Sequence, residues 1–414
     1  MSAQRGYDAL IIGGGAAGMM AALTLAEAGR RVALLEKQDR VGRKLLSTGN
    51  GRCNLTNLNA GAGDYHGARR AAGAVLRAWP PKKVMARFEG LGIPCVWDDA
   101  GRVYPMSRQA ASVLDALRLG CDEAGVVTRT GFPVTALTPS RGGYEARSAS
   151  GETLWGRVAL VCTGGLAAPK LGACGDGSRL LEALGHQVVP PFAALAPLKT
   201  PQDAVRGLKG LRAEALLTLE SDGEVLRSER GEVLFADYGV SGIAAMQLAR
   251  SAAVALARGR SVALRLDFLP GREALPTLKE RARALPRRRL EDFLNGIVPK
   301  RLGQALVRRV GLDPALMVGA MTGEMLLALS AAVGGWTLPI RGVQGFDQAQ
   351  VTAGGADLSG FDTRRMASLH APGLFAAGEV LDVDGDCGGF NLQWAFSSAL
   401  VAAAGMNATL EETT

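Results

Sequence analysis

The first forty residues pass from a short apolar segment through a glycine-rich turn into an alanine-rich helical pattern. Residues 7–12 are apolar and β-prone, residues 13–18 contain four glycines, residues 21–28 continue as a helix, and residues 31–35 are again apolar. Short apolar runs bounded by glycine predict buried strands, and the longer alanine-rich run predicts a helix. The pattern therefore predicts a strand, turn, helix and strand unit at the start of an α/β fold.

Further along the chain the hydrophobic pattern changes twice. Residues 108–124 have apolar positions at helical spacing, and residues 126–160 alternate as short strands separated by turn signals. This second pattern predicts a small antiparallel insertion. After a proline-rich stretch at 190–197, residues 216–233 predict strands and residues 273–332 predict a largely helical region.

The end of the chain returns to the pattern of its beginning. Residues 351–406 read as strand, glycine turn and helix, and 414 residues are too many for one compact core. We therefore expect a discontinuous first domain, residues 1–195 and 345–414, with an inserted domain at 196–344.

Composition excludes several classes of protein. The chain is 48% hydrophobic and 21% charged, as expected of an ordered globular protein, and its six cysteines form no C-x-x-C pair. We expect no metal site. The N-terminus does not resemble a signal peptide, and the apolar run 395–406 is shorter than the roughly 20 residues that a membrane span needs. A cytoplasmic protein without a membrane segment is expected.

Positive charge is concentrated in one region. The net charge is +8, and the segment 279–309 alone carries ten basic residues against three acidic ones. Such a run is usually a solvated helix surface, and its alternative is a face that binds a polyanion such as RNA. The sequence leaves both interpretations open.

The glycine-rich turn has the G-x-G-x-x-G spacing of a dinucleotide-binding motif. Gly13 permits the tight turn, Gly15 lets a pyrophosphate approach the backbone, and Gly18 allows close packing of helix on strand. The start of the helix then directs free N–H groups at the phosphates. Glu36, at the end of the second strand, is placed to accept hydrogen bonds from an adenosine ribose.

The C-terminal segment favours FAD over NAD as the bound dinucleotide. A strand at 373–377 delivers Glu379 toward a ribityl or ribose hydroxyl, and a helix begins after Gly388-Gly389. N–H groups at that helix start can stabilise negative charge at the N1/O2 edge of a reduced flavin. A second G-x-G-x-x-G turn after a strand is absent, so we expect no separate nicotinamide domain. The electron donor, for which NAD(P)H is one candidate, stays open.

Two segments, 42–57 (GRKLLSTGNGRCNLTN) and 378–385 (GEVLDVDG), resemble signatures of the BaiN-type, or aminoacetone-oxidase-like, family of FAD-binding proteins. Further similarity runs through 101–105, 163–165 and 351–355 and covers nearly the whole chain. The resemblance implies a glutathione-reductase-like FAD-binding Rossmann domain with an inserted domain. The insertion would have a β-barrel part at about 196–270 and 335–344 and a helical part at about 271–334.

Glycine spacing and this resemblance together indicate one set of FAD-contacting residues, drawn from both ends of the chain. In it, Arg43, Lys44 and Arg52 would supply positive charge for phosphate or reduced flavin. The set is Gly13, Gly15, Ala16, Ala17, Gly18, Glu36, Lys37, Arg43, Lys44, Leu45, Gly49, Asn50, Arg52, Cys53, Asn54, Val134, Thr163, Gly164, Gly165, Asp176, Gly378, Glu379, Gly389, Phe390 and Asn391.

Reduction of a C=C bond also requires a proton donor. The candidates are Tyr104, Cys53, Asp237 and, behind them, Cys387. Asp237 enters because relatives usually carry threonine and histidine after Leu-Phe, where this chain has Ala236-Asp237. The three histidines lie outside the glycine-rich segments, and we interpret them as structural.

These observations favour an FAD-dependent oxidoreductase that transfers hydride from reduced flavin to an activated C=C bond of a small molecule. One alternative is a flavin-dependent enzyme that forms dihydrouridine in ribosomal RNA and binds it through the segment 279–309. An amine-oxidase-like enzyme and a non-catalytic flavin-binding protein are further alternatives. The oligomeric state is not readable from the sequence.

Overall fold

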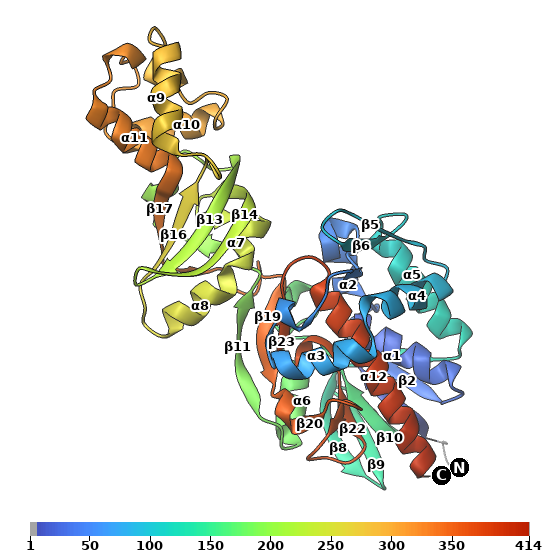
Figure 1. The fold of residues 1–414 in the computed structure, drawn as a ribbon. Helices are drawn as coiled ribbons and strands as arrows, with labels where there is room; N and C mark the ends of the chain where they lie inside the picture. The colour runs from blue at the N-terminus through green and yellow to red at the C-terminus, as the bar shows by residue number, and fades with distance from the viewer. Residues whose placement is uncertain (1–5, 414) are drawn as a thin grey trace. The chain divides into compact units, whose positions relative to one another are not determined.

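The computed structural model describes residues 6–413, which fold as two compact units (Figure 1). The first unit combines the chain up to Phe192 with the chain from Gln350 onward, and the second spans Ala193–Ala349. Each unit has its own hydrophobic core. The two units are therefore described separately.

The first unit is built on a largely parallel sheet in the order β20-β21-β22-β10-β1-β2-β7. Four neighbouring pairs in its centre, from β22 to β7, are parallel, whereas β8 and β9 extend β10 with antiparallel pairing. The strands are β1 (Tyr7–Ile12), β2 (Val32–Leu35), β7 (Val127–Arg129), β8 (Val134–Ser140), β9 (Gly143–Ser148), β10 (Thr153–Val161), β20 (Phe361–Asp362), β21 (Ala367–Ser368) and β22 (Leu374–Ala376).

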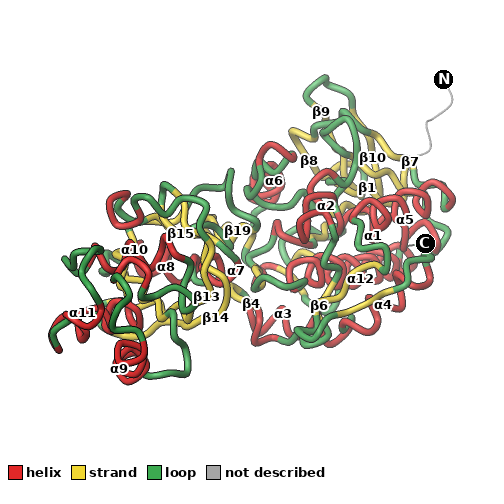
Figure 2. The backbone as a smooth tube through the Cα atoms, turned by 90° about the horizontal axis from the view of Figure 1, so that it is seen from above, coloured by secondary structure: helices red, strands yellow, loops and turns green. Residues whose placement is uncertain are grey.

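Helices cover this sheet, and the last of them is the longest. The 23-residue helix α12 (Phe390–Glu412) packs against α1 (Ala16–Glu27), and both views of the backbone show the two side by side (Figures 1 and 2). The apolar run 395–406 lies within α12. Within residues 6–413 no helix is long and apolar enough to cross a membrane. The other helices are α2 (Arg43–Ser47), α3 (Arg69–Ala78), α4 (Pro81–Gly90), α5 (Ala110–Glu123) and α6 (Asp176–Ala183).

Three small sheets complete the first unit. They pair β3 (Thr56–Asn57) with β6 (Arg102–Pro105) and β5 (Cys95–Trp97), β4 (Tyr65–Gly67) with β23 (Val383–Gly385), and β11 (Val188–Ala194) with β19 (Val351–Ala356). Because β4 and β23 come from opposite ends of the chain, their pairing joins the two halves of the discontinuous unit.

The second unit contains a seven-stranded sheet in the order β17-β16-β13-β14-β15-β12-β18. A helical part follows β16 and packs around Leu278, Phe293 and Leu306. The strands are β12 (Leu198–Lys199), β13 (Arg212–Ser221), β14 (Glu224–Ala236), β15 (Gly239–Ser241), β16 (Val262–Asp267), β17 (Trp336–Ile340) and β18 (Gly342–Val343). The helices are α7 (Ile243–Gln247), α8 (Ala249–Ala257), α9 (Ala274–Ala284), α10 (Lys300–Arg309) and α11 (Gly323–Gly335).

Substitutions at two glycines of the first turn should distinguish an effect on folding from an effect on ligand binding. A Cβ at Gly18 would overlap the carbonyl oxygen of Gly13, whereas a Cβ at Gly15 would meet nothing within 4 Å. We expect Gly18→Ala to destabilise the first unit by about 1–3 kcal/mol, because the helix must move away from the strand. Gly15→Ala should leave the thermal unfolding of the flavin-free protein unchanged, since φ at Gly15 is −85°. Circular dichroism would measure the unfolding temperature of both variants, and an equal decrease in the two would contradict this packing argument.

A buried histidine, His186, should make the stability of the first unit depend on pH. His186 is 4% exposed, stacks on Phe361 at 4.2 Å between ring centroids, and its Nε2 lies 2.8 Å from the Ser368 hydroxyl. Burial, with a smaller contribution from His370, lowers the pKa of His186 from 6.5 to about 4. Between these two values the unfolded chain binds a proton that the folded chain does not.

Stability of the first unit should therefore fall as the pH drops from about 6.5 to about 4 and should be fully retained above 6.5. The free energy of unfolding, measured in urea at several pH values, checks this. In His186→Leu the dependence over that range should flatten even if the variant is less stable at neutral pH. An unchanged slope would assign the acid sensitivity to other groups.

Candidate functional site

The glycine turn after β1 leaves an open helix start. Gly13 adopts a φ of 113°, α1 begins at Ala16, and no side chain caps its N-terminus at Gly15. Since a Cβ at Gly15 would point into open space, a ligand can approach the backbone here. Free N–H groups and the positive end of the helix dipole favour a phosphate at this position, where Ala16 and Ala17 form the first turn.

A carboxylate at the end of β2 is held beside this turn. Glu36 Oε2 accepts a hydrogen bond from Gly14 N at 2.8 Å, and Oε1 accepts one from Gln38 N at 2.8 Å. Each oxygen keeps a further lone pair for a ribose hydroxyl. The segment leading to Val134 is attached to the same strand end, since Phe132 N donates to Glu36 O at 2.9 Å.

Basic side chains lie next to Glu36. Lys37 Nζ donates to Asp176 Oδ2 at 2.8 Å, and Arg43 Nη1 donates to Gln38 Oε1 at 2.5 Å. Burial by itself would lower the pKa of Lys37, but hydrogen bonds to Asp176 and Cys174 raise it overall. The ammonium group is therefore charged at neutral pH.

The loop that follows α2 has an unusual backbone. Asn50 and Cys53 adopt positive φ values of 54° and 56°, and Gly49 between α2 and Asn50 has φ 57°. Left-handed backbone at residues other than glycine is costly and gathers at functional sites. Buried Leu45 anchors α2 at one side of this loop, whereas Arg52 is exposed.

Segments far apart in sequence meet around Glu379. Its Oε2 accepts a hydrogen bond from Lys44 Nζ at 2.6 Å, and its Oε1 accepts one from Thr352 N at 2.8 Å. The Thr352 hydroxyl in turn accepts hydrogen bonds from the backbone of Leu166 and Ala167 at 2.8 and 2.9 Å. This network joins the loops that follow β10 and β22 to α2.

The Thr163-Gly164-Gly165 turn is packed too tightly for larger residues. A Cβ at Gly165 would lie 2.5 Å from Thr352 Oγ1, and one at Gly177 would overlap Thr163 Oγ1. Gly164 has φ 74°, and a Cβ there would lie 3.9 Å from Glu379 Oε2. The turn therefore belongs to the same assembly as Glu379, which follows Gly378.

The N-terminus of α12, like that of α1, follows a glycine. Gly389 precedes it with φ 100°, no side chain caps it, and Phe390 is its first residue. The Asn391 side chain folds back onto Gly385, accepting from its N–H and donating to its carbonyl oxygen, both at 2.8 Å. Asn54 Oδ1 is buried beside this helix start and has no hydrogen-bond partner among the described residues.

The candidate proton donors lie in different surroundings. Tyr104 on β6 is 9% exposed, lies beside Gly49, and its hydroxyl has no hydrogen-bond partner within residues 6–413. Cys53 is fully buried, and burial raises the pKa of its thiol to about 12. Asp237 belongs to the second unit, where its exposed carboxylate pairs with Lys209. The structure therefore places Tyr104 and Cys53, but not Asp237, in the unit that carries the glycine turns.

Sequence patterns did not single out two residues that organise the site. Thr352 was part of a family-like segment, yet only the structure shows that it connects Glu379 to the 163–167 turn. Gln393 is fully buried, accepts from the Thr56 hydroxyl, and donates to Trp79 O at 2.8 Å.

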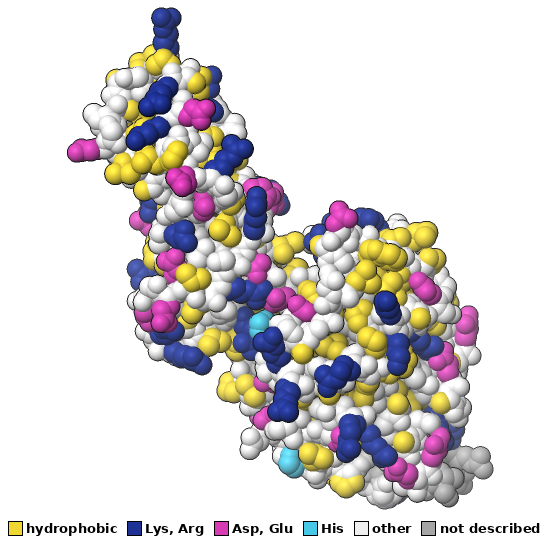
Figure 3. All heavy atoms as spheres, viewed as in Figure 1, with side chains coloured by type: hydrophobic (Ala, Val, Ile, Leu, Met, Phe, Trp, Pro, Cys, Tyr) yellow, Lys and Arg dark blue, Asp and Glu magenta, His cyan; other side chains and the backbone are white. Residues whose placement is uncertain are grey.

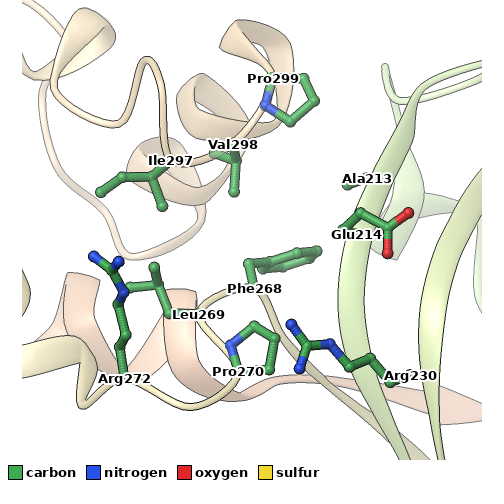
Figure 4. A pocket seen from close by; sticks show the side chains of 10 residues that line it. All are labelled: Ala213, Glu214, Arg230, Phe268, Leu269, Pro270, Arg272, Ile297, Val298 and Pro299. Carbon is green, nitrogen blue, oxygen red and sulfur yellow. The ribbon is translucent and has the colours of Figure 1, made fainter.

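A separate hollow lies within the second unit, between its sheet and its helical part (Figure 4). It has a volume of about 210 Å³, an apolar floor around Phe268 and Pro270, and a rim of mixed charge formed by Glu214, Arg230 and Arg272. None of its lining residues is a glycine. The close backbone approach that a dinucleotide uses is found at the turns of the first unit instead.

The features of the first unit fit FAD. The N–H groups at the starts of α1 and α12, the space at Gly15 and an unpartnered buried oxygen on Asn54 suit a dinucleotide with a polar ring system. The loops that carry them follow β1, β2, β10 and β22, so they meet at the carboxyl edge of the parallel sheet. Ligands of open α/β sheets bind at this edge.

Comparison with known proteins supports this assignment. A family described as "HI0933-like protein Rossmann domain" matches residues 7–405. A 3-dehydro-bile acid delta(4,6)-reductase from Clostridium scindens is 36% identical over 402 residues, which are 95% of this chain and 97% of that protein. A ribosomal RNA dihydrouridine synthase from Escherichia coli is 31% identical and covers 96% of this chain and 97% of its own length.

Solved structures with low sequence identity share the fold. A flavocytochrome c3 fumarate reductase in an open conformation superposes with a TM-score of 0.51 and 16% identity, covering 99% of this chain and 79% of that one. A 3-ketosteroid delta1-dehydrogenase from Sterolibacterium denitrificans gives a TM-score of 0.51 and 15% identity, with 98% and 100% coverage. The match confirms the resemblance to BaiN-type flavoproteins: the chain belongs to the HI0933-like family, and its first unit is a Rossmann-like FAD-binding domain.

Proposed function

We propose that this flavoprotein oxidoreductase reduces an activated C=C bond in a small molecule. The observation that carries the proposal is the 36% identity, over 95% of the chain, to a reductase named for a steroid-ring double-bond reaction. The open helix starts of the first unit support it, because they suit a flavin whose ring gains negative charge on reduction.

The residues that would hold FAD divide by the part of the cofactor they face. N–H groups at the start of α1 would bind the pyrophosphate, and Glu36 would accept from the ribose. Glu379, held by Lys44, would face the ribityl hydroxyls, and the start of α12 would stabilise negative charge at the pyrimidine edge. When bound, FAD supplies hydride transfer at N5.

Tyr104 is the proton donor that the geometry favours. Its hydroxyl has no partner among the described residues, and its ring lies against the Gly49 turn of the cofactor loop. Cys53 has no exposed surface through which to reach a substrate, although its thiol keeps its proton. Asp237 is engaged with Lys209. A phenol can donate a proton to the second carbon as hydride reaches the first.

Tyr104→Phe should separate the two half-reactions. Reduction of bound FAD by NADPH, followed anaerobically from the oxidised flavin band, should keep its rate. Transfer from reduced flavin to an enone steroid should slow by roughly 10²–10⁴-fold, since the proton donor is gone. A larger loss in Asp237→Asn than in Tyr104→Phe would assign the proton to Asp237. A flavin that no nicotinamide reduces would point to another donor or to a non-catalytic role.

Ribosomal RNA is the second candidate substrate, because two relatives are named ribosomal RNA dihydrouridine synthases. The structure divides the basic segment 279–309 into two sets. Arg281, Lys300 and Arg301 bond to neighbouring protein groups. Arg289 also pairs with Glu291, and the Arg309 guanidinium lies over the Trp336 ring. Within residues 6–413, no ion pair or side-chain hydrogen bond engages the exposed Lys279, Arg283, Arg287, Arg288 and Arg308. Figure 3 shows basic side chains spread over this helical part.

Charge reversal tests the RNA alternative. If the surface binds phosphates, a triple variant Arg283→Glu, Arg287→Glu and Arg288→Glu should weaken binding to a ribosomal RNA fragment. It should also reduce the slope of log affinity against log salt by about one per lost contact. Fluorescence anisotropy across a KCl series measures both. A native protein that does not bind the fragment, or a variant with an unchanged slope, would rule out this surface and favour the small-molecule substrate.

A further inference from the structure

Asn54 carries an unpaired acceptor at the point where two ends of the chain meet. Its Oδ1 is buried and has no hydrogen-bond partner within residues 6–413. A Cβ at Gly389 would lie 2.7 Å from this oxygen, so the amide is directly beside the start of α12. An amide oxygen left without a donor in a buried place is energetically unfavourable. A bound group that donates a hydrogen bond would remove this cost.

Backbone hydrogen bonds hold the chain on both sides of Asn54. Cys53 N donates to Thr48 O at 3.0 Å before it, and Leu55 N donates to Val103 O at 2.8 Å after it. Thr56 then pairs with Val103 in the strand register. The side chain therefore projects from a segment anchored on both sides.

The start of α12, which faces Asn54, is also held by hydrogen bonds. The Thr56 hydroxyl donates to the buried Gln393 on the first turn of α12, and Gln393 Nε2 donates to Trp79 O at 2.8 Å. A Cβ at Gly389 would overlap Thr56 O, which shows how closely the helix start approaches this segment. Asn54 and the uncapped N–H groups of α12 thus present an acceptor and donors to one place.

This combination matches one edge of the flavin. The pyrimidine edge presents carbonyl oxygens on both sides of N3–H, and N3–H is the one N–H of the oxidised ring. The N–H groups of α12 suit a carbonyl oxygen, whereas Asn54 Oδ1 suits a donor. We propose that Asn54 accepts a hydrogen bond from flavin N3–H and thereby sets the orientation of the ring. The inference rests on FAD binding and is independent of which substrate is reduced.

FAD methylated at N3 tests this contact, because the analogue lacks the proton that Asn54 would accept. The native full-length chain, freed of flavin, should bind 3-methyl-FAD at least about tenfold more weakly than FAD. In Asn54→Ala the two flavins should bind within about threefold of each other. Flavin fluorescence quenching gives both dissociation constants without any substrate, so failure here would leave the proposed reaction untouched.

Matched variants separate this role from a general effect on the fold. Asn59→Ala removes an exposed amide five residues further along and should keep the native preference for FAD. Asn54→Ser, which keeps an oxygen at a shorter reach, serves if Asn54→Ala does not fold, and it should show a reduced preference. Equal binding of both flavins by the native chain, or a native preference that persists in the Asn54 variants, would overturn the proposal.

Discussion

Close contact between α1 and the parallel sheet is the constraint on which the rest of the first unit depends. Gly18 lies so near the carbonyl oxygen of Gly13 that a methyl group cannot fit, and the Cys162 sulfur stands 3.0 Å from the same Cβ position. This contact sets the direction in which the uncapped start of α1 points. Because β1, β2, β10 and β22 run parallel, the loops after them reach the same edge of the sheet. The position of α1 then determines where along this edge a dinucleotide phosphate would bind.

Long-range hydrogen bonds then convert this edge into a site. Lys44 and Glu379 are 335 residues apart, and Thr352 connects Glu379 to the 163–167 turn. Tyr65 donates to Phe390 O at 2.8 Å, which ties the β4–β23 pair to the start of α12. The Lys44–Glu379, Leu166–Thr352 and Tyr65–Phe390 bonds each join the N-terminal part of the unit, or its middle, to the C-terminal part. The two parts of the discontinuous unit are thus joined by hydrogen bonds at the place where the cofactor is expected to bind.

Basic side chains have different surroundings in the two units. In the first unit, basic groups such as Lys37 and Lys44 are paired with Asp176 and Glu379 and face the cofactor loops. In the second unit, part of the basic segment supports the fold, as where Arg281 donates to Phe293 O at 2.6 Å. Other basic residues of the segment, such as Arg287 and Arg288, are exposed, so net charge alone does not identify a partner.

The sequence by itself determined the Rossmann-type fold, the glycine turn and the two helix starts, because these depend on local spacing and on the size of glycine. Tertiary structure alone decided which side chains meet. It brought Thr352 and Gln393 into the site, left Asn54 with an unpaired oxygen and buried Cys53. These outcomes follow from packing between segments hundreds of residues apart, and no local pattern in the chain specifies such contacts.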